Sequence, residues 1–271
     1  MLEAVRPQAP PAPEPADRFA SLTGIHYGSG DGRPALVFLH GLTWDCTMWA
    51  PTLQELSKLA PQREVLALNL PGHGNSPRQD SYPLAEVVEQ VHGAVTAAGI
   101  ASPAIVGHSV AGVLATFYAA RYPTARVVNV DQTLFVKPFA EAMLNAIANG
   151  AGYEDLWAFN KSAMGIETLP IPAQQLLEST STPRPDLLAG YWGELAEQTP
   201  DSLQARFDEN ARRVATRQIP YTIVTGSDHD PAYAAWLRRT LPDAETVVVE
   251  SGGHLPHLAD PQRFAEVLAA K

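Results

Sequence analysis

The sequence predicts an α/β fold in which a mostly parallel central sheet is covered by helices on both faces. Short apolar runs of strand length alternate with stretches whose apolar residues recur at helical spacing. Continuous apolar runs are typical of strands buried on both faces, and strands that alternate with helices form parallel sheets. Residues 132–216 break this rhythm, because they are rich in Ala, Leu, Glu and Gln and have almost no β-branched runs. They predict either an inserted helical cap, which we favour, or more helices covering the same sheet.

The individual elements follow from the same patterns. Buried strands are expected at 35–39 and 64–70, and further strands at 104–106, 127–130, 220–225 and 246–249. Helices are expected at 49–59, 84–98, 110–121, 139–148, 201–214 and 261–270. Asn149-Gly150 is a typical helix end, and Thr199-Pro200 is a typical helix start.

The chain is therefore expected to have three parts. Residues 1–17 contain five prolines and no apolar segment, which predicts an extended tail and not a secretory signal. Residues 18–131 and 217–271 are expected to form the α/β core, and residues 132–216 the cap. A chain of 271 residues is long enough to bury such a core.

Composition narrows the classes of function. The formal net charge of −10 argues against nucleic acid and anionic membranes as main partners. The single cysteine, Cys46, excludes an intramolecular disulfide framework and suits a reducing compartment. No apolar stretch reaches the roughly 18 residues of a membrane span. We therefore expect a cytoplasmic protein that acts on a small molecule.

The strongest chemical signal is the run Gly107-His108-Ser109-Val110-Ala111-Gly112, which joins a predicted strand to a predicted helix. A serine flanked by small residues at a tight strand-to-helix turn is typical of a nucleophile elbow. Gly107 and Ala111 are expected to be small because the strand and the helix pass close together there. The start of the helix leaves N–H groups free, so the N–H of Val110 is placed to stabilise an oxyanion.

Three other motifs stand in a fixed order around this elbow. His40-Gly41-Leu42-Thr43 follows the first buried strand, and Asn69-Leu70-Pro71-Gly72-His73-Gly74-Asn75-Ser76 follows the second. Gly252-Gly253-His254 follows the last strand and precedes the C-terminal helix. A serine that precedes its histidine in the chain fits the order Ser, acid, His of the elbow-type hydrolases.

Together these motifs resemble those of the α/β-hydrolase family. The resemblance implies the α/β-hydrolase fold, with Ser109 as the nucleophile and His254 as its general base, and with His257 as the reserve candidate. It implies that the N–H of Leu42 is the second oxyanion donor and that the turn at residues 69–76 is structural. Haloalkane dehalogenases and epoxide hydrolases of this fold use an aspartate at the elbow, so Ser109 argues against both.

The acid that would orient His254 has three candidates. In the family it usually follows the strand expected here at 220–225, which favours Asp228 first and leaves Asp230 third. A second position used in the family is the end of the preceding strand, where Asp131 is the other candidate. Each aspartate can also be explained as a turn former, a helix cap or a strand-end residue that binds loop amides.

The predicted substrate is a small, largely apolar ester, lactone or similar acyl compound. Trp44, Phe135, Phe139 and Trp157 are expected to line an apolar pocket. The histidines lack metal-ligand spacing and no glycine-rich phosphate loop follows a strand, so neither a metal nor an organic cofactor is expected. Alternative functions on the same residues are C–C bond hydrolysis, perhydrolysis, acyl transfer, and slow-turnover ligand sensing.

Overall fold

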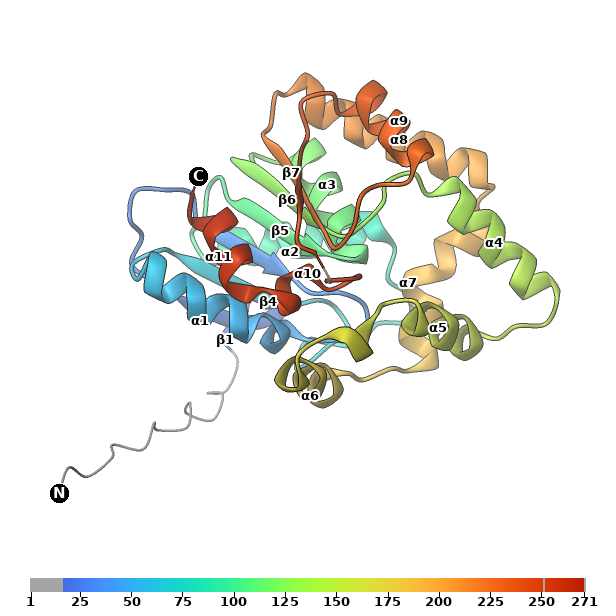
Figure 1. Cartoon of the computed structure of the whole chain (residues 1–271), viewed down its shortest axis with the longest axis horizontal. Coiled ribbons are helices and arrows are strands. Elements are labelled where there is room, and N and C mark those ends of the chain that lie inside the picture. Colours follow the sequence, from blue (N-terminus) through green and yellow to red (C-terminus); the bar gives the residue numbers. More distant parts are fainter. Residues whose placement is uncertain (1–16, 251, 271) are drawn as a thin grey trace.

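The computed structural model describes residues 17–250 and 252–270, and within them one eight-stranded sheet runs through the molecule (Figure 1). Its order is β1-β2-β4-β3-β5-β6-β7-β8. From β3 onward the strands are parallel, whereas β1 and β2 are antiparallel to their neighbours. The strands are β1 (Asp17–Phe19), β2 (Leu22–Tyr27), β3 (Leu36–Leu39), β4 (Val65–Asn69), β5 (Ala104–His108), β6 (Arg126–Val130), β7 (Tyr221–Thr225) and β8 (Glu245–Val248).

Helices cover both faces of this sheet, which confirms the predicted fold class. Helices α1 and α11 pack together on one face, and α2, α3, α8 and α9 form a continuous layer on the other (Figure 1). The helices are η1 (Cys46–Trp49), α1 (Ala50–Leu59), α2 (Leu84–Ala97), α3 (Val110–Arg121), α4 (Lys137–Ala148), α5 (Tyr153–Ser162), η2 (Ile166–Thr168), α6 (Ile171–Thr180), α7 (Pro185–Glu197), α8 (Pro200–Thr216), α9 (Pro231–Thr240), α10 (Pro256–Ala259) and α11 (Pro261–Ala269).

The N-terminal edge of the sheet differs from the expectation. The predicted tail at 1–17 lies outside the described residues except for Asp17, which begins β1. Strands β1 and β2 were not expected, because neither contains a continuous apolar run. They form an antiparallel pair at the edge, where one face of a strand can remain polar.

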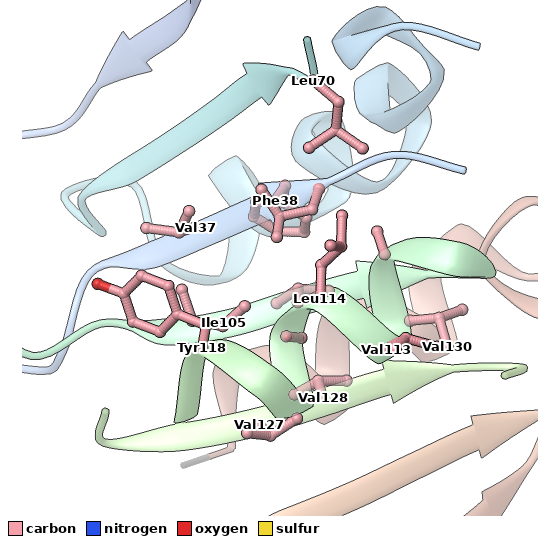
Figure 2. Close-up of a cluster of buried hydrophobic side chains, with 14 of the residues drawn as sticks. Val37, Phe38, Leu70, Ile105, Val113, Leu114, Tyr118, Val127, Val128 and Val130 are labelled. Atoms are coloured by element: carbon pink, nitrogen blue, oxygen red, sulfur yellow. The ribbon is translucent and has the colours of Figure 1, made fainter. Parts of the chain in front are cut away.

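The centre of the sheet is fully buried. Every residue of β3, β5 and β6 is buried, including the polar side chains of His108, Arg126 and Asn129. Figure 2 shows Leu114 and Tyr118 of α3 lying over side chains of these strands, among them Phe38 and Ile105. Burial of each such side chain stabilises the fold by about 1.5–3 kcal/mol. This packing fixes the carboxyl ends of β3, β5 and β6 relative to one another.

The segment at 132–216, which the structure describes throughout, contains only helices as regular elements. Helices α4 to α7 lie beyond the carboxyl ends of the strands (Figure 1). Helix α8 instead packs on the core helix α3, where the rings of Phe207 and Phe117 are 5.2 Å apart and Arg217 donates to the carbonyl of Ala119. The inserted segment therefore combines helices over the strand ends with one helix that covers the sheet.

The helices over the strand ends are attached to the core through the turn at Pro71 and Gly72. Tyr191 Oη on α7 donates to the carbonyl of Pro71 at 3.0 Å, and Arg184 Nη2 donates to that of Gly72 at 3.1 Å. The N–H of Thr182 donates to the carbonyl of Thr43 at 2.7 Å.

Among the helices that the structure describes, none is long and apolar enough to cross a membrane.

Candidate active site

The candidate site lies at the carboxyl edge of the parallel strands. Strand β3 lies between β4 and β5, so the chain direction across the sheet reverses there, and ligands of α/β sheets bind outside such a point. A cavity of about 550 Å³ opens at this edge, and Ser109, Asp131 and His254 all line it. Residues from the ends of β5 and β6 and from the loop after β8 thus meet at one cavity.

The turn that carries Ser109 is strained. Its φ of 55° and ψ of −132° lie in a region that side-chain-bearing residues rarely adopt. Ser109 N–H donates to the carbonyl of Val130 at 3.0 Å, which links the turn to β6. A Cβ on Gly107 would lie 2.0 Å from the carbonyl oxygen of Ala111. The expected close approach of strand and helix is confirmed, and only glycine fits at position 107.

The loop that carries His254 depends on two glycines. Gly226 and Gly253 form an antiparallel bridge, and a Cβ on Gly226 would lie 2.2 Å from the carbonyl oxygen of Gly253. Gly253 itself has a φ of +49°, and a Cβ there would lie 2.6 Å from the carbonyl oxygen of Met164. The N–H of His254 donates to that same carbonyl at 3.1 Å. Met164 belongs to the inserted segment, so this segment and the core together place His254.

The imidazole of His254 binds Asp131. Its Nδ1 lies 2.8 Å from Asp131 Oδ2, and the hydroxyl of Thr225 lies 2.6 Å from Asp131 Oδ1. Burial raises the pKa of Asp131, but the hydrogen bonds and positive potential of His254, with the hydroxyl of Thr225, outweigh it and leave the pKa below its usual range. An ionised carboxylate only accepts, so His254 Nδ1 carries a hydrogen, and in the neutral imidazole the lone pair is then on Nε2.

This contact favours Asp131 over Asp228, which the sequence places first. Asp131 follows β6, which is directly beside β5, and its φ of 52° turns the backbone at the strand end. Asp228 is an exposed residue of the cavity wall. Asp230 also lines the cavity, but its carboxylate accepts the N–H groups of Ala232 and Tyr233 and so caps α9. The geometry favours Asp131 as the acid.

The two residues expected to supply oxyanion donors both line the cavity. Val110 is the first residue of α3, so its N–H has no partner within the helix. Leu42 lies in the loop after β3. His73 binds that loop, because its Nε2 accepts the N–H of Thr43 at 3.1 Å, and Thr43 has a φ of 73°. Both residues therefore lie at the cavity that Ser109 also lines.

Two of the four expected pocket residues line the cavity, namely Phe139 and Trp157. Trp44 does not, because it is buried with its ring 5.9 Å from that of Trp157 and 5.8 Å from that of His108. Phe135 is half-buried and also lies outside the lining. The other apolar and aromatic lining residues include Leu84, Val113, Val136, Tyr191, Trp192, Leu203, Phe207 and Tyr233.

The cavity wall carries acidic groups that no Lys or Arg among its described lining residues offsets. Among its described lining residues are Asp131, Glu194, Asp228 and Asp230, but no Lys or Arg. Glu194 is neutralised by an ion pair with Arg206 just outside the lining, and Asp131 is bound by His254. Asp228 and Asp230 are exposed and keep the wall negative. Within the described residues, no group of three or more His, Cys, Asp or Glu is arranged to hold a metal ion.

Two residues beside the site, Thr225 and His108, are not expected from the sequence. Thr225 ends β7 and binds Asp131, but a threonine at a strand end is too common to be a signal. His108 precedes Ser109 and is completely buried, with its Nε2 2.9 Å from the carbonyl oxygen of His254. Its position inside the elbow motif was the available signal, although a buried histidine is not predictable from that position alone.

Comparison with known proteins agrees with the fold and the motifs. Residues 36–267 match the model of a family described as the alpha/beta hydrolase family. "Putative carbamate hydrolase RutD" of Escherichia coli O127:H6 is 26% identical over 252 residues, which cover 87% of this chain and 90% of that protein.

Solved structures show the same fold. E-2-(acetamidomethylene)succinate hydrolase has a TM-score of 0.69 at 21% identity, covering 92% of this chain and 94% of that chain. The enol-lactonase of Burkholderia xenovorans LB400 has a TM-score of 0.67 at 19% identity, covering 94% of this chain and 98% of that chain.

Proposed function

The chain belongs to the alpha/beta hydrolase family, and from this premise we propose that it is a serine hydrolase of uncharged or cationic acyl compounds. Ser109, His254 and Asp131 are the proposed triad. The observation that carries the proposal is the 2.8 Å contact from His254 Nδ1 to Asp131, in the cavity that Ser109 also lines. With the hydrogen of the neutral imidazole held on Nδ1, the lone pair is on Nε2, which is the tautomer that a general base needs.

The proposed first half-reaction forms an acyl-enzyme. Ser109 Oγ attacks the substrate carbonyl carbon while its proton moves to Nε2 of His254. The carbonyl oxygen becomes an oxyanion, which the N–H groups of Leu42 and Val110 stabilise by about 3 kcal/mol per donor. The carbon–leaving-group bond then breaks, and His254 returns the proton to the leaving group. Asp131 remains ionised and stabilises the imidazolium.

The second half-reaction releases the acid. A water molecule gives one proton to His254 Nε2 and attacks the acyl carbon of the ester on Ser109. The second oxyanion uses the same two N–H groups, and its collapse breaks the bond to Oγ. His254 returns the proton to Ser109, so the net reaction consumes one water and yields the free acid and the leaving group.

The lining and the volume of the cavity support a proposal for the class of substrate. Aromatic and aliphatic side chains make most of its lining, and a volume of about 550 Å³ suits a small to medium molecule. The described lining offers no Lys or Arg to bind a carboxylate or phosphate. We therefore place uncharged esters and lactones first. The RutD relative is named for carbamates, whose uncharged esters have the same acyl chemistry.

Hydrolysis of p-nitrophenyl esters of increasing chain length tests the proposal, with Ser109→Ala as the matched variant. The wild type is expected to release p-nitrophenol over many turnovers, and Ser109→Ala to lose at least about 10³-fold in kcat. Equal rates for both proteins would contradict a serine mechanism. A single stoichiometric burst without turnover would instead indicate a ligand sensor, and product formed on an added alcohol would indicate an acyltransferase.

A further inference from the structure

His108 lies buried between the nucleophile turn and the loop that carries His254. It is 0% exposed, and its Nε2 is 2.9 Å from the carbonyl oxygen of His254. A carbonyl oxygen only accepts, so Nε2 of His108 must carry the hydrogen. This assignment leaves the lone pair on Nδ1, which has no hydrogen-bond partner among the described residues.

The ring of His108 also contacts the loop that carries the Leu42 donor. A Cβ on Gly41 would lie 2.6 Å from His108 Nδ1, so the missing side chain of Gly41 makes room for this ring. On its other side, the ring centroid is 4.9 Å from that of His254. His108 therefore contacts three parts of the proposed machinery at once: it precedes Ser109 in the chain, it packs on the oxyanion loop, and it holds the base loop.

Packing alone does not account for a histidine here. An apolar ring would fill the same space without burying an unpaired nitrogen, which is unfavourable. Burial, together with the neighbouring His257 and His254, holds the pKa of His108 well below its usual range. The ring is therefore a neutral donor, and it does not repel the positive charge that His254 would gain during the reaction.

We propose that His108 is a positioning residue that holds the backbone of His254 through its Nε2–H, so that the imidazole keeps its bond to Asp131 while it faces Ser109. The inference rests on the proposed function for the roles of Ser109 and His254. Displacement of a base by about 1 Å can cost about 10²-fold in rate. One hydrogen bond to the base loop therefore has a measurable catalytic consequence.

Two substitutions separate positioning from packing. His108→Phe keeps a ring but removes the donor, whereas the amide of His108→Gln places an N–H at about the distance of Nε2. We expect His108→Phe to lower kcat by about 10- to 100-fold with KM within about threefold, and His108→Gln to recover most of the loss. His92→Phe is the matched control, because His92 stacks on Tyr122 and is not among the cavity-lining residues. It is expected to leave kcat unchanged.

The outcomes distinguish this inference from the function on which it rests. A wild-type kcat in His108→Phe would overturn the positioning role. Equal losses of kcat in His108→Phe and His108→Gln would also overturn it, if these losses match the loss of folded protein measured by circular dichroism. If the wild type has no esterase activity, ¹⁵N NMR of the imidazoles still tests the inference. The spectrum should show a neutral His108 with its hydrogen on Nε2. The substitution His108→Phe should shift the imidazole signals of His254. A ring protonated on Nδ1 would contradict the assignment.

Discussion

At the scale of single residues, the site depends on how Asp131 is held. Both carboxylate oxygens are bound, Oδ2 by His254 at 2.8 Å and Oδ1 by Thr225 at 2.6 Å. These contacts explain why the pKa of this carboxyl stays below its usual range although burial raises it. Asp131 is therefore ionised at neutral pH and fixes the tautomer of His254, whereas Asp228 remains a charge on the cavity wall.

Paired substitutions test this assignment of the acid. Asp131→Asn is expected to lower kcat by about 10⁴-fold, because an amide stabilises the wrong imidazole tautomer. Asp228→Asn removes the same charge from the same cavity and is expected to change kcat for an uncharged ester by less than about threefold. Steady-state kinetics on one p-nitrophenyl ester compares the two. A larger loss in Asp228→Asn than in Asp131→Asn would restore Asp228 as the acid.

Sequence patterns predict the candidate residues of the site better than their pairing. The elbow at Ser109 and the loop at His254 are recognisable because glycines mark them locally. The choice between Asp131 and Asp228 is not local, because both follow buried strands. It depends on the unusual φ of Asp131 and on the contact of the His254 loop with Met164, which no periodicity encodes.

At the scale of elements, the turn at Ser109 depends on a close contact between the strand before it and the helix after it. Gly107 lies so close to the carbonyl of Ala111 that any Cβ at position 107 would overlap the carbonyl oxygen. Largely apolar runs predict β3 to β7 because both faces of these strands are buried. Strands β1 and β2 lack that signal. Nor does the amphipathic pattern of α8 reveal whether its partner is the core or the inserted helices, since either would bury the same face.

Glycine-to-alanine substitutions test the contact at the elbow. Gly107→Ala is expected to destabilise the protein by about 2–4 kcal/mol, because its Cβ would lie 2.0 Å from a backbone oxygen that cannot move cheaply. Gly193→Ala, inside α7 with nothing within 4 Å of the added Cβ, is expected to stabilise by about 0.5–1 kcal/mol. Urea unfolding measures both. Similar changes in the two variants would contradict the account.

At the scale of the whole molecule, four buried histidines couple folding to pH. His40, His73, His108 and His257 are each at most 3% exposed. Burial lowers the pKa of all four, to about 4 for His40 and to about 3 for His257. In the unfolded chain each has an ordinary pKa of about 6.5. The unfolded state therefore binds more protons in acid, and the stability present above about pH 6.5 is lost as the pH falls.

This linkage predicts a steep acid limb of stability. Each histidine that stays neutral in the folded state contributes up to about 1.4 kcal/mol per pH unit between pH 6 and pH 4. His257→Phe removes one such group, so its stability should fall less steeply than that of the wild type over this range. Urea unfolding at several pH values measures the slopes. Stability that is constant from pH 7 to pH 4.5 would contradict neutral buried histidines.

The charge of the cavity wall predicts a preference among substrates. With equal leaving groups, p-nitrophenyl butyrate should exceed the anionic p-nitrophenyl succinate in kcat/KM by about tenfold or more, and added salt should narrow the gap. Asp228→Asn is expected to narrow it as well. Asp243→Asn is the matched control, because this exposed residue precedes β8 at the opposite edge of the sheet. A faster reaction with the anionic ester would contradict the proposed substrate class.

Covalent labelling tests the central claim, that Ser109 is the nucleophile, most directly. A fluorophosphonate reacts with a serine only when a neighbouring base and oxyanion donors activate it. After incubation and digestion, mass spectrometry should place one adduct per chain on the peptide that contains Ser109, and should find none in Ser109→Ala. Labelling in Asp131→Asn should be much slower than in the wild type. An adduct on another residue, or equal labelling of Ser109→Ala, would contradict the account.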